Sequence, residues 1–129
     1  MSRYGISKKL ECGYEEAVGR ARASLSKQGF GVLTEIDVAA TLKKKLGKEF
    51  RNYIILGACN PPLAHKALTV ETEVGLLLPC NVIVYENDEG SVTVSAIDPQ
   101  VAMSMIENPA LALVAKDVKE LLEKVIEDL

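Results

Sequence analysis

The fold is decided by a run of ten residues, YIILGACNPP, at positions 53–62. Residues 53–58 are apolar on both faces of a strand, so the pattern predicts a strand that is covered on both sides and lies inside a sheet rather than at its edge. Asn60 precedes Pro61, and an oxygen-bearing cap before a proline is typical of a helix start. The run therefore predicts a central strand that passes through Cys59 into a helix.

Similar signals predict where the other helices begin and end. Asp98 and Asn108 each precede a proline, so further helices are expected to begin there. After Asn108, apolar side chains recur at steps of three and four up to the end of the chain, which predicts a long helix that packs by one stripe. Two earlier helices, at residues 14–25 and 38–46, are each followed by a glycine that can take the left-handed conformation of a helix C-cap.

The remaining apolar runs predict strands. Residues 6–10 and 32–36 have strand-like patterns, and residues 82–85 and 92–97 flank Asn-Asp-Glu-Gly, which favours an antiparallel hairpin. The elements then follow the order βαβαβα, ββ and two helices. We expect a single α+β domain over residues 1–129, with a mixed β-sheet of about five strands packed against helices.

Composition restricts the class of protein. The 129 residues are 48% hydrophobic and 26% charged, which is typical of one globular core. The net charge of −3 gives no electrostatic reason to expect a nucleic-acid partner. The first residues do not resemble a signal peptide and no apolar run is long enough to span a membrane, so we expect a cytoplasmic protein with no membrane partner. The high apolar fraction favours a homodimer.

Two near-echoes surround two of the three cysteines: GACNPP at residues 57–62 and LPCN at residues 78–81. Cys59 is expected just before a helix N-terminus, where the helix dipole can lower the pKa of a thiol and favour the thiolate. The other interpretation, which we prefer, is that Cys59 fills a small gap in the core. Asn60 is expected to cap the helix, and Asn81 to meet backbone at the entry of a strand.

The only histidine, His65, is expected on the flank of the helix that follows Asn60, where solvent reaches it. Together with Cys12, Cys59 and Cys80 it would complete a Cys₃His set for zinc, but no two of these cysteines have the close spacing of a zinc module. We therefore assign no metal, and keep Cys59, His65 and Cys80 as the only weak candidates for one.

Two further features admit a binding interpretation. A soft-metal site could combine Cys59 and Cys80 with Met103 or Met105, but the simpler expectation places both methionines in the core. Lysines at positions 43–45, with Lys48 and Arg51, form the one locally basic stretch, which is more simply a solvated helix face than a site for an anion or an acidic partner. No cofactor is assigned.

A set of short motifs resembles a known family. They are GFGV at residues 29–32, the segment 37–47, GACNP at 57–61, GLLLPCNV at 75–82 and VYE at 84–86. Together they resemble domain-of-unknown-function family 302, over roughly residues 29 to 98. The resemblance implies a small α+β domain from bacteria or archaea, commonly a homodimer. It implies no established activity, and no catalytic residue is carried over from it.

No familiar catalytic signature is present: the chain lacks a Gly-x-Ser-x-Gly elbow, a phosphate loop, a dinucleotide fingerprint and a His-Glu-x-x-His pair. The leading hypothesis is a non-catalytic homodimeric domain that binds a small ligand or a protein partner. Its candidate binding residues are Cys59, Asn60, His65, Cys80 and Asn81. The alternative is a thiol-based enzyme or a protein that handles soft metals, and a third hypothesis is a structural dimer without a ligand.

Overall fold

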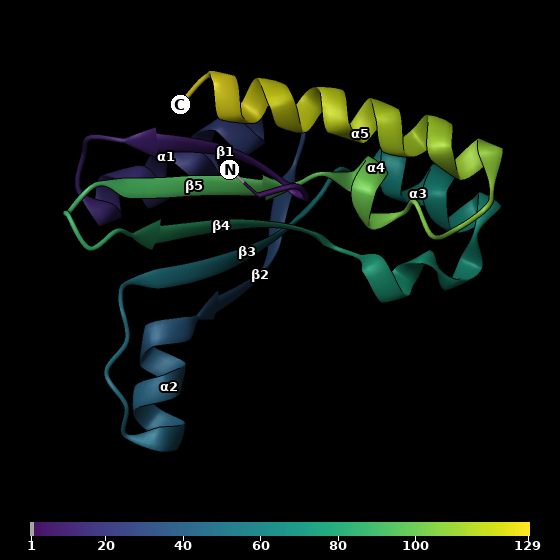
Figure 1. Cartoon of the computed structure of the whole chain (residues 1–129). Coiled ribbons are helices and arrows are strands. Elements are labelled where there is room, and N and C mark those ends of the chain that lie inside the picture. Colours follow the sequence, from purple (N-terminus) through teal and green to yellow (C-terminus); the bar gives the residue numbers. More distant parts are fainter. Residues whose placement is uncertain (1) are drawn as a thin grey trace.

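The computed structural model describes residues 2–129 (Figure 1). Its elements are β1 (Gly5–Leu10), α1 (Tyr14–Lys27), β2 (Gly31–Asp37), α2 (Val38–Leu46), β3 (Tyr53–Cys59), α3 (Pro61–Val70), the 3₁₀ helix η1 (Thr72–Leu77), β4 (Cys80–Glu86), β5 (Val92–Ile97), α4 (Pro99–Ala102) and α5 (Pro109–Glu127). The α+β class and the predicted order of elements are confirmed. Only η1 was not predicted.

The five strands form one sheet in the order β1-β5-β4-β3-β2, and every neighbouring pair is antiparallel. The predicted number of strands is confirmed, but the expectation of a mixed sheet is wrong. A helix between two strands makes them parallel only when it crosses over the sheet. Here α2 projects from the end of the β2–β3 pair like a long hairpin connection (Figure 1), and it contains no buried residue.

The predicted helix starts are confirmed by their caps. The Asn60 side chain accepts a hydrogen bond from the backbone N–H of Leu63 at 3.3 Å. Asp98 and Asn108 accept comparable bonds at the starts of α4 and α5. Gly29 and Gly47, which follow α1 and α2, have φ angles of 82° and 65°, the left-handed conformation that glycine adopts at low cost.

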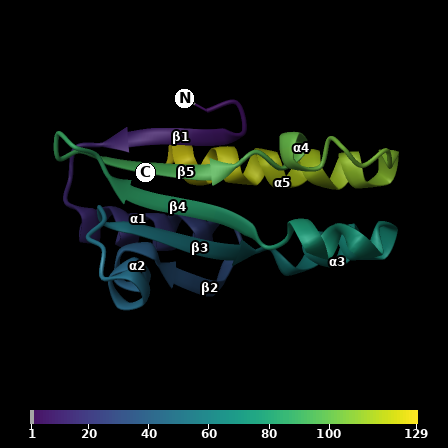
Figure 2. The ribbon, with the colours of Figure 1, turned by 60° about the horizontal axis from the view of Figure 1, so that its bottom comes forward.

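Helices α1 and α5 pack on one side of the sheet, and Figure 2 shows both behind the strands. The core lies between these two layers. Its fully buried side chains include Leu25 from α1, Leu56 from β3 and Leu122 from α5. On β4 and β5, the valines that point to this side are fully buried as well: Val82, Val84, Val92 and Val94. We call this side of the sheet the covered face.

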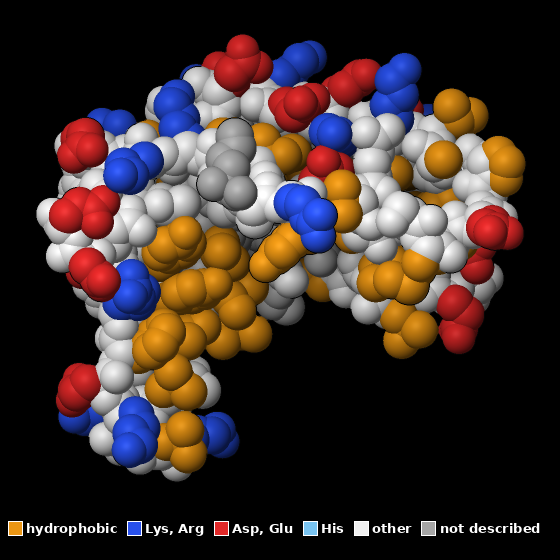
Figure 3. All heavy atoms as spheres, viewed as in Figure 1, with side chains coloured by type: hydrophobic (Ala, Val, Ile, Leu, Met, Phe, Trp, Pro, Cys, Tyr) orange, Lys and Arg blue, Asp and Glu red, His pale blue; other side chains and the backbone are white. Residues whose placement is uncertain are grey.

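The opposite side, which we call the open face, contradicts one prediction. The apolar pattern of β3 predicted cover on both sides, yet Tyr53 and Ile55 of β3 are only half-buried and face away from α1 and α5. A row of cross-strand partners runs over this face: Ile36, Ile55, Ile83, Ser95 and Ser7. Figure 3 shows the apolar side chains gathered in a hollow beneath the sheet.

Among residues 2–129, no helix is both long enough and apolar enough to cross a membrane.

Candidate ligand-binding site

A cavity of about 270 Å³ lies where β3 and β4 meet α3 and α5. Its walls are almost entirely apolar, and the side chains that shape it include Phe30, Leu63, Ala67, Met103, Val114 and Ala115. Phe30 follows α1, Leu63 and Ala67 come from α3, and Val114 and Ala115 come from α5. The cavity therefore depends on the packing of segments that are far apart in the sequence.

Three of the predicted site residues line this cavity: Cys59, Asn60 and Cys80. The register of the sheet explains why they meet, because Ala58 of β3 lies opposite Cys80 of β4 and Cys59 is the next residue along. Asn60 then begins the turn into α3. The two near-echoes of the sequence are thus brought to one end of the sheet.

Cys80 is buried, and this burial raises the pKa of its thiol to about 11, with a smaller contribution from neighbouring Cys59. Ionising a thiol in apolar surroundings costs free energy, so the neutral thiol of Cys80 is the stable form near pH 7. Because the thiolate is the nucleophile and the metal ligand, a raised pKa works against both roles for Cys80. Its contribution to the wall is that of a small apolar side chain.

Asn60, which lines the cavity, links the start of α3 to the turn after α1. Its side-chain oxygen caps α3, and its Nδ2 donates to the backbone carbonyl of Gln28 at 3.4 Å. A Cβ at Gly29 would lie 3.2 Å from the same Nδ2, so the turn after α1 passes close to the start of α3. Both polar ends of the amide are therefore used by the protein, which leaves the cavity wall apolar.

The other candidate residues lie elsewhere. His65 is exposed, as predicted for a helix flank, and does not line the cavity. Asn81 is the neighbour of Cys80 on β4, and successive side chains of a strand point to opposite faces, so it lies at the open face. Cys12 lies at the connection from β1 to α1. Within residues 2–129, no group of three or more His, Cys, Asp or Glu residues is placed to hold a metal ion.

The two methionines have different environments. Met103 is 7% exposed and lines the cavity, as a residue of the core. Met105 is 77% exposed, so the expectation that it fills the core is wrong. It lies in the turn after α4, which has only four residues, rather than on a helix that packs against the core.

Sequence reasoning missed the apolar walls, because their residues have ordinary core patterns and nothing distinguishes a residue beside a cavity from one in a filled core. It also missed a second, wider concavity of about 680 Å³ on the open face. Its lining mixes aromatic and polar side chains, among them Tyr53, Tyr85, Ser95 and Asn81. The two-faced apolar pattern of β3 was a signal for this surface.

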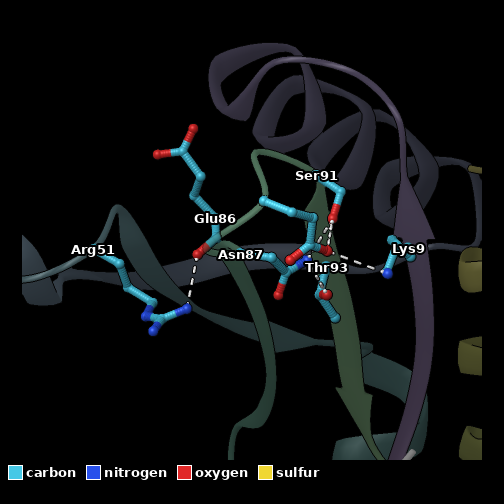
Figure 4. Close-up of polar contacts among 7 residues, drawn as sticks. Lys9, Arg51, Glu86, Asn87, Ser91 and Thr93 are labelled. Carbon is cyan, nitrogen blue, oxygen red and sulfur yellow. Dashed lines mark hydrogen bonds and ion pairs between the residues drawn. The ribbon is translucent and has the colours of Figure 1, made fainter.

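A polar network at the β4–β5 turn has a structural role (Figure 4). The side-chain amide of Asn87 donates to Ser91 Oγ at 3.0 Å and to Thr93 Oγ1 at 2.9 Å. Glu89 accepts a hydrogen bond from Ser91 and pairs with Lys9 of β1. The bond from Ser91, then one from the backbone N–H of Glu89 itself, then the contact with Lys9 lower the pKa of the Glu89 carboxyl to about 2. The network ties the hairpin to β1 through contacts within the chain.

The comparisons with known proteins agree with the fold. A family model described as "Domain of unknown function DUF302" matches residues 6–129. A crystal structure of an uncharacterized conserved DUF302 protein from Bacillus stearothermophilus is similar over 98% of each chain, with 30% sequence identity and a TM-score of 0.91. No match was found among curated proteins.

Proposed function

Since the chain belongs to the DUF302 family, whose function is not known, we propose a function from its own cavity: a non-catalytic, homodimeric domain that binds a small apolar molecule. The observation that carries this proposal is the cavity of about 270 Å³ beside Cys59, Asn60 and Cys80. Ligand sites in proteins are concave, mostly apolar and carry few polar groups.

The size and lining of the cavity define the class of ligand. Its volume lies just below the usual range for small-molecule sites, which corresponds to a ligand on the order of ten to fifteen non-hydrogen atoms. No lysine or arginine lines the wall, so an organic anion would lack a countercharge there. A small aromatic compound or a short branched acyl chain matches these walls.

The chemistry of the wall supports binding rather than catalysis. The raised pKa of Cys80 keeps its thiol protonated near neutral pH, and the Asn60 amide is occupied by Leu63 and Gln28. His65, the only histidine, does not line the cavity, so it is not placed there as a base that could activate a cysteine.

Titration with indole, observed by methyl NMR, tests the proposed function. We expect saturable shifts of the Met103 and Ala115 methyl signals, because both residues line the cavity. Ala64→Phe fills the cavity from α3 and should abolish the shifts, whereas Ala112→Phe, on an exposed position of α5, should preserve them. Shifts that are absent in the unmodified protein, or that survive Ala64→Phe, would contradict the proposal.

A further inference from the structure

The open face belongs to a larger concave surface with projecting parts at both ends. One part is α2 and the segment that follows it, residues 38–50, which we call the arm; the other is α3 with η1, residues 61–77, which we call the lobe. Figures 1 and 3 show the arm and the η1 part of the lobe at opposite ends of the sheet, with the hollow between them.

The arm exposes apolar side chains that have no place in the core. Leu46 is 65% exposed and Phe50 is 48% exposed, and none of the nine residues of α2 is buried. A helix of this length is marginal in water unless tertiary contacts support it. Phe50 lies against Tyr53, and Tyr53 stacks on Tyr85 with ring centroids 5.4 Å apart, so the apolar surface continues from the arm onto the open face.

The lobe completes the apolar surface at the other end. Leu76 of η1 is 83% exposed, and Leu68 of α3 is 42% exposed. A Cβ at Gly75 would lie 3.9 Å from Leu68 Cδ2, so these parts of α3 and η1 are neighbours. Exposed apolar side chains therefore lie on the arm, the open face and the lobe, and a contiguous apolar patch of this kind is typical of an interaction surface.

The two ends of the concave surface carry opposite charges. The arm contains Lys44, Lys45 and Lys48, which form no ion pair within residues 2–129. The lobe contains two glutamates, Glu71 and Glu73, against one lysine, Lys66, and Glu73 is exposed and forms no ion pair within the described residues. A basic end and an acidic end on one surface can pair when two copies meet in opposite directions.

We propose that a second copy of this chain docks on the concave surface about a two-fold axis, with the arm of each copy against the lobe of the other. A two-fold contact uses the same patch twice, so the patch must be complementary to itself. This arrangement pairs arm lysines with Glu73 and Leu46 with Leu76, and it covers the open face. An arm-against-arm arrangement would instead bring the lysines together, and like charges at an interface are costly.

This inference rests on the homodimer in the proposed function and adds the surface through which the copies meet. Carbodiimide cross-linking of ¹⁴N- and ¹⁵N-labelled protein, refolded together, tests it directly, because the reagent joins only lysine and carboxylate groups in contact. We expect mixed-isotope cross-links from Lys44, Lys45 or Lys48 to Glu73. A dimer whose cross-links at Glu73 are absent or only within one copy would overturn the docking.

Charge reversal gives an independent test by native mass spectrometry. Lys44→Glu with Lys45→Glu should raise the dissociation constant of the dimer by on the order of tenfold, and adding Glu73→Lys should restore it. The matched control, Lys116→Glu on an exposed position of α5, should leave the constant unchanged. An unchanged constant in the arm variant, or no rescue by Glu73→Lys, would overturn the proposed contact.

The indole titration distinguishes this inference from the proposed ligand site. A chain that is monomeric at every concentration but still shifts Met103 with indole would overturn the docking and the homodimer, and leave ligand binding standing. A dimer with the expected cross-links but no indole shifts would retain the docking surface and refute the ligand class.

Discussion

The two faces of one sheet differ although they are built from the same strands. On the covered face, Leu56, Val82 and Val84 are fully buried against α1 and α5. On the open face, the alternate residues Ile55, Ile83 and Tyr85 are also large and apolar, yet they remain half-buried. The covered face is explained by the core of a single chain. The open face also carries large apolar residues, but this core does not bury them fully. We therefore relate them to contacts with another molecule.

The largest expected effect compares neighbouring residues of β3. Leu56→Ala should lower the free energy of unfolding by about 3 kcal/mol, because it removes a fully buried side chain from the covered face. Ile55→Ala should cost about 1 kcal/mol in dilute protein, because Ile55 is only half-buried. Urea denaturation measures both.

Protein concentration should affect these two variants differently. Binding of a second copy stabilises the folded chain by mass action, so the loss caused by Ile55→Ala should grow with concentration more than the loss caused by Leu56→Ala. Equal losses for the two variants in dilute protein would contradict the distinction between the faces.

Much of the fold was predictable because its signals are local. The caps at Asn60, Asp98 and Asn108 and the glycines after α1 and α2 act within one helical turn, and the structure confirms them. Strand pairing was not predictable in the same way. Whether α2 crosses the sheet or projects from its end depends on distant contacts, and η1 lacks the apolar period that identifies a longer helix.

The second expected effect concerns the Cys80 thiol on the covered side. Its pKa rises from 9.0 to about 11 in the folded chain, so the unfolded chain loses this proton first as pH rises. Below pH 9 the neutral thiol contributes its full stabilisation to the folded chain. As the pH rises from 9 to 11, the titration of this group should lower the free energy of unfolding by about 2 kcal/mol. The unfolding free energy of Cys80→Ala should therefore fall less over this interval than that of the unmodified protein.

Other groups titrate over the same interval, so the difference between the two proteins is the quantity to measure. Identical slopes from pH 9 to pH 11 would show that Cys80 is not desolvated. Slow alkylation of Cys80 at pH 7 is expected from the same shift, and rapid alkylation of the native protein would count against it.

A smaller effect separates the two asparagines of the near-echoes. Asn60→Ala should destabilise the protein by about 1 kcal/mol, because it removes the α3 cap and the bond to Gln28. Asn81→Ala should change stability by less than about 0.5 kcal/mol, because Asn81 is exposed on the open face. Thermal denaturation measures both losses of stability, and a larger loss for Asn81→Ala than for Asn60→Ala would contradict these structural roles.

The candidate site was only partly predictable. The register of β3 and β4 brings Cys59 and Cys80 together, and each of these cysteines lies in one of the two near-echoes of the sequence. Asn81 could have been separated from Cys80 by the two-residue period of a strand, since neighbours point to opposite faces. The cavity walls could not be predicted, because they depend on how Phe30, α3 and α5 pack around the strand ends.

The smallest expected effect is at His65. His65→Ala should change the unfolding free energy by less than about 0.5 kcal/mol, because the side chain is exposed. The indole affinity should also remain unchanged, since His65 does not line the cavity. Methyl NMR titration of this variant checks the second point, and a several-fold loss of affinity would extend the site to the flank of α3.

The solvent accessibility of two exposed leucines reports directly on the concave surface, and the effect of a soluble gadolinium chelate on their methyl relaxation measures it. In the single chain Leu76 is 83% exposed and Leu113 is 67% exposed, so a monomer predicts the stronger effect at Leu76. A second copy docked through arm and lobe covers Leu76 and leaves Leu113 on α5 outside the proposed contact. We therefore predict a much weaker effect at Leu76 than at Leu113, and the opposite order would contradict the covering of the concave surface by a second copy in solution.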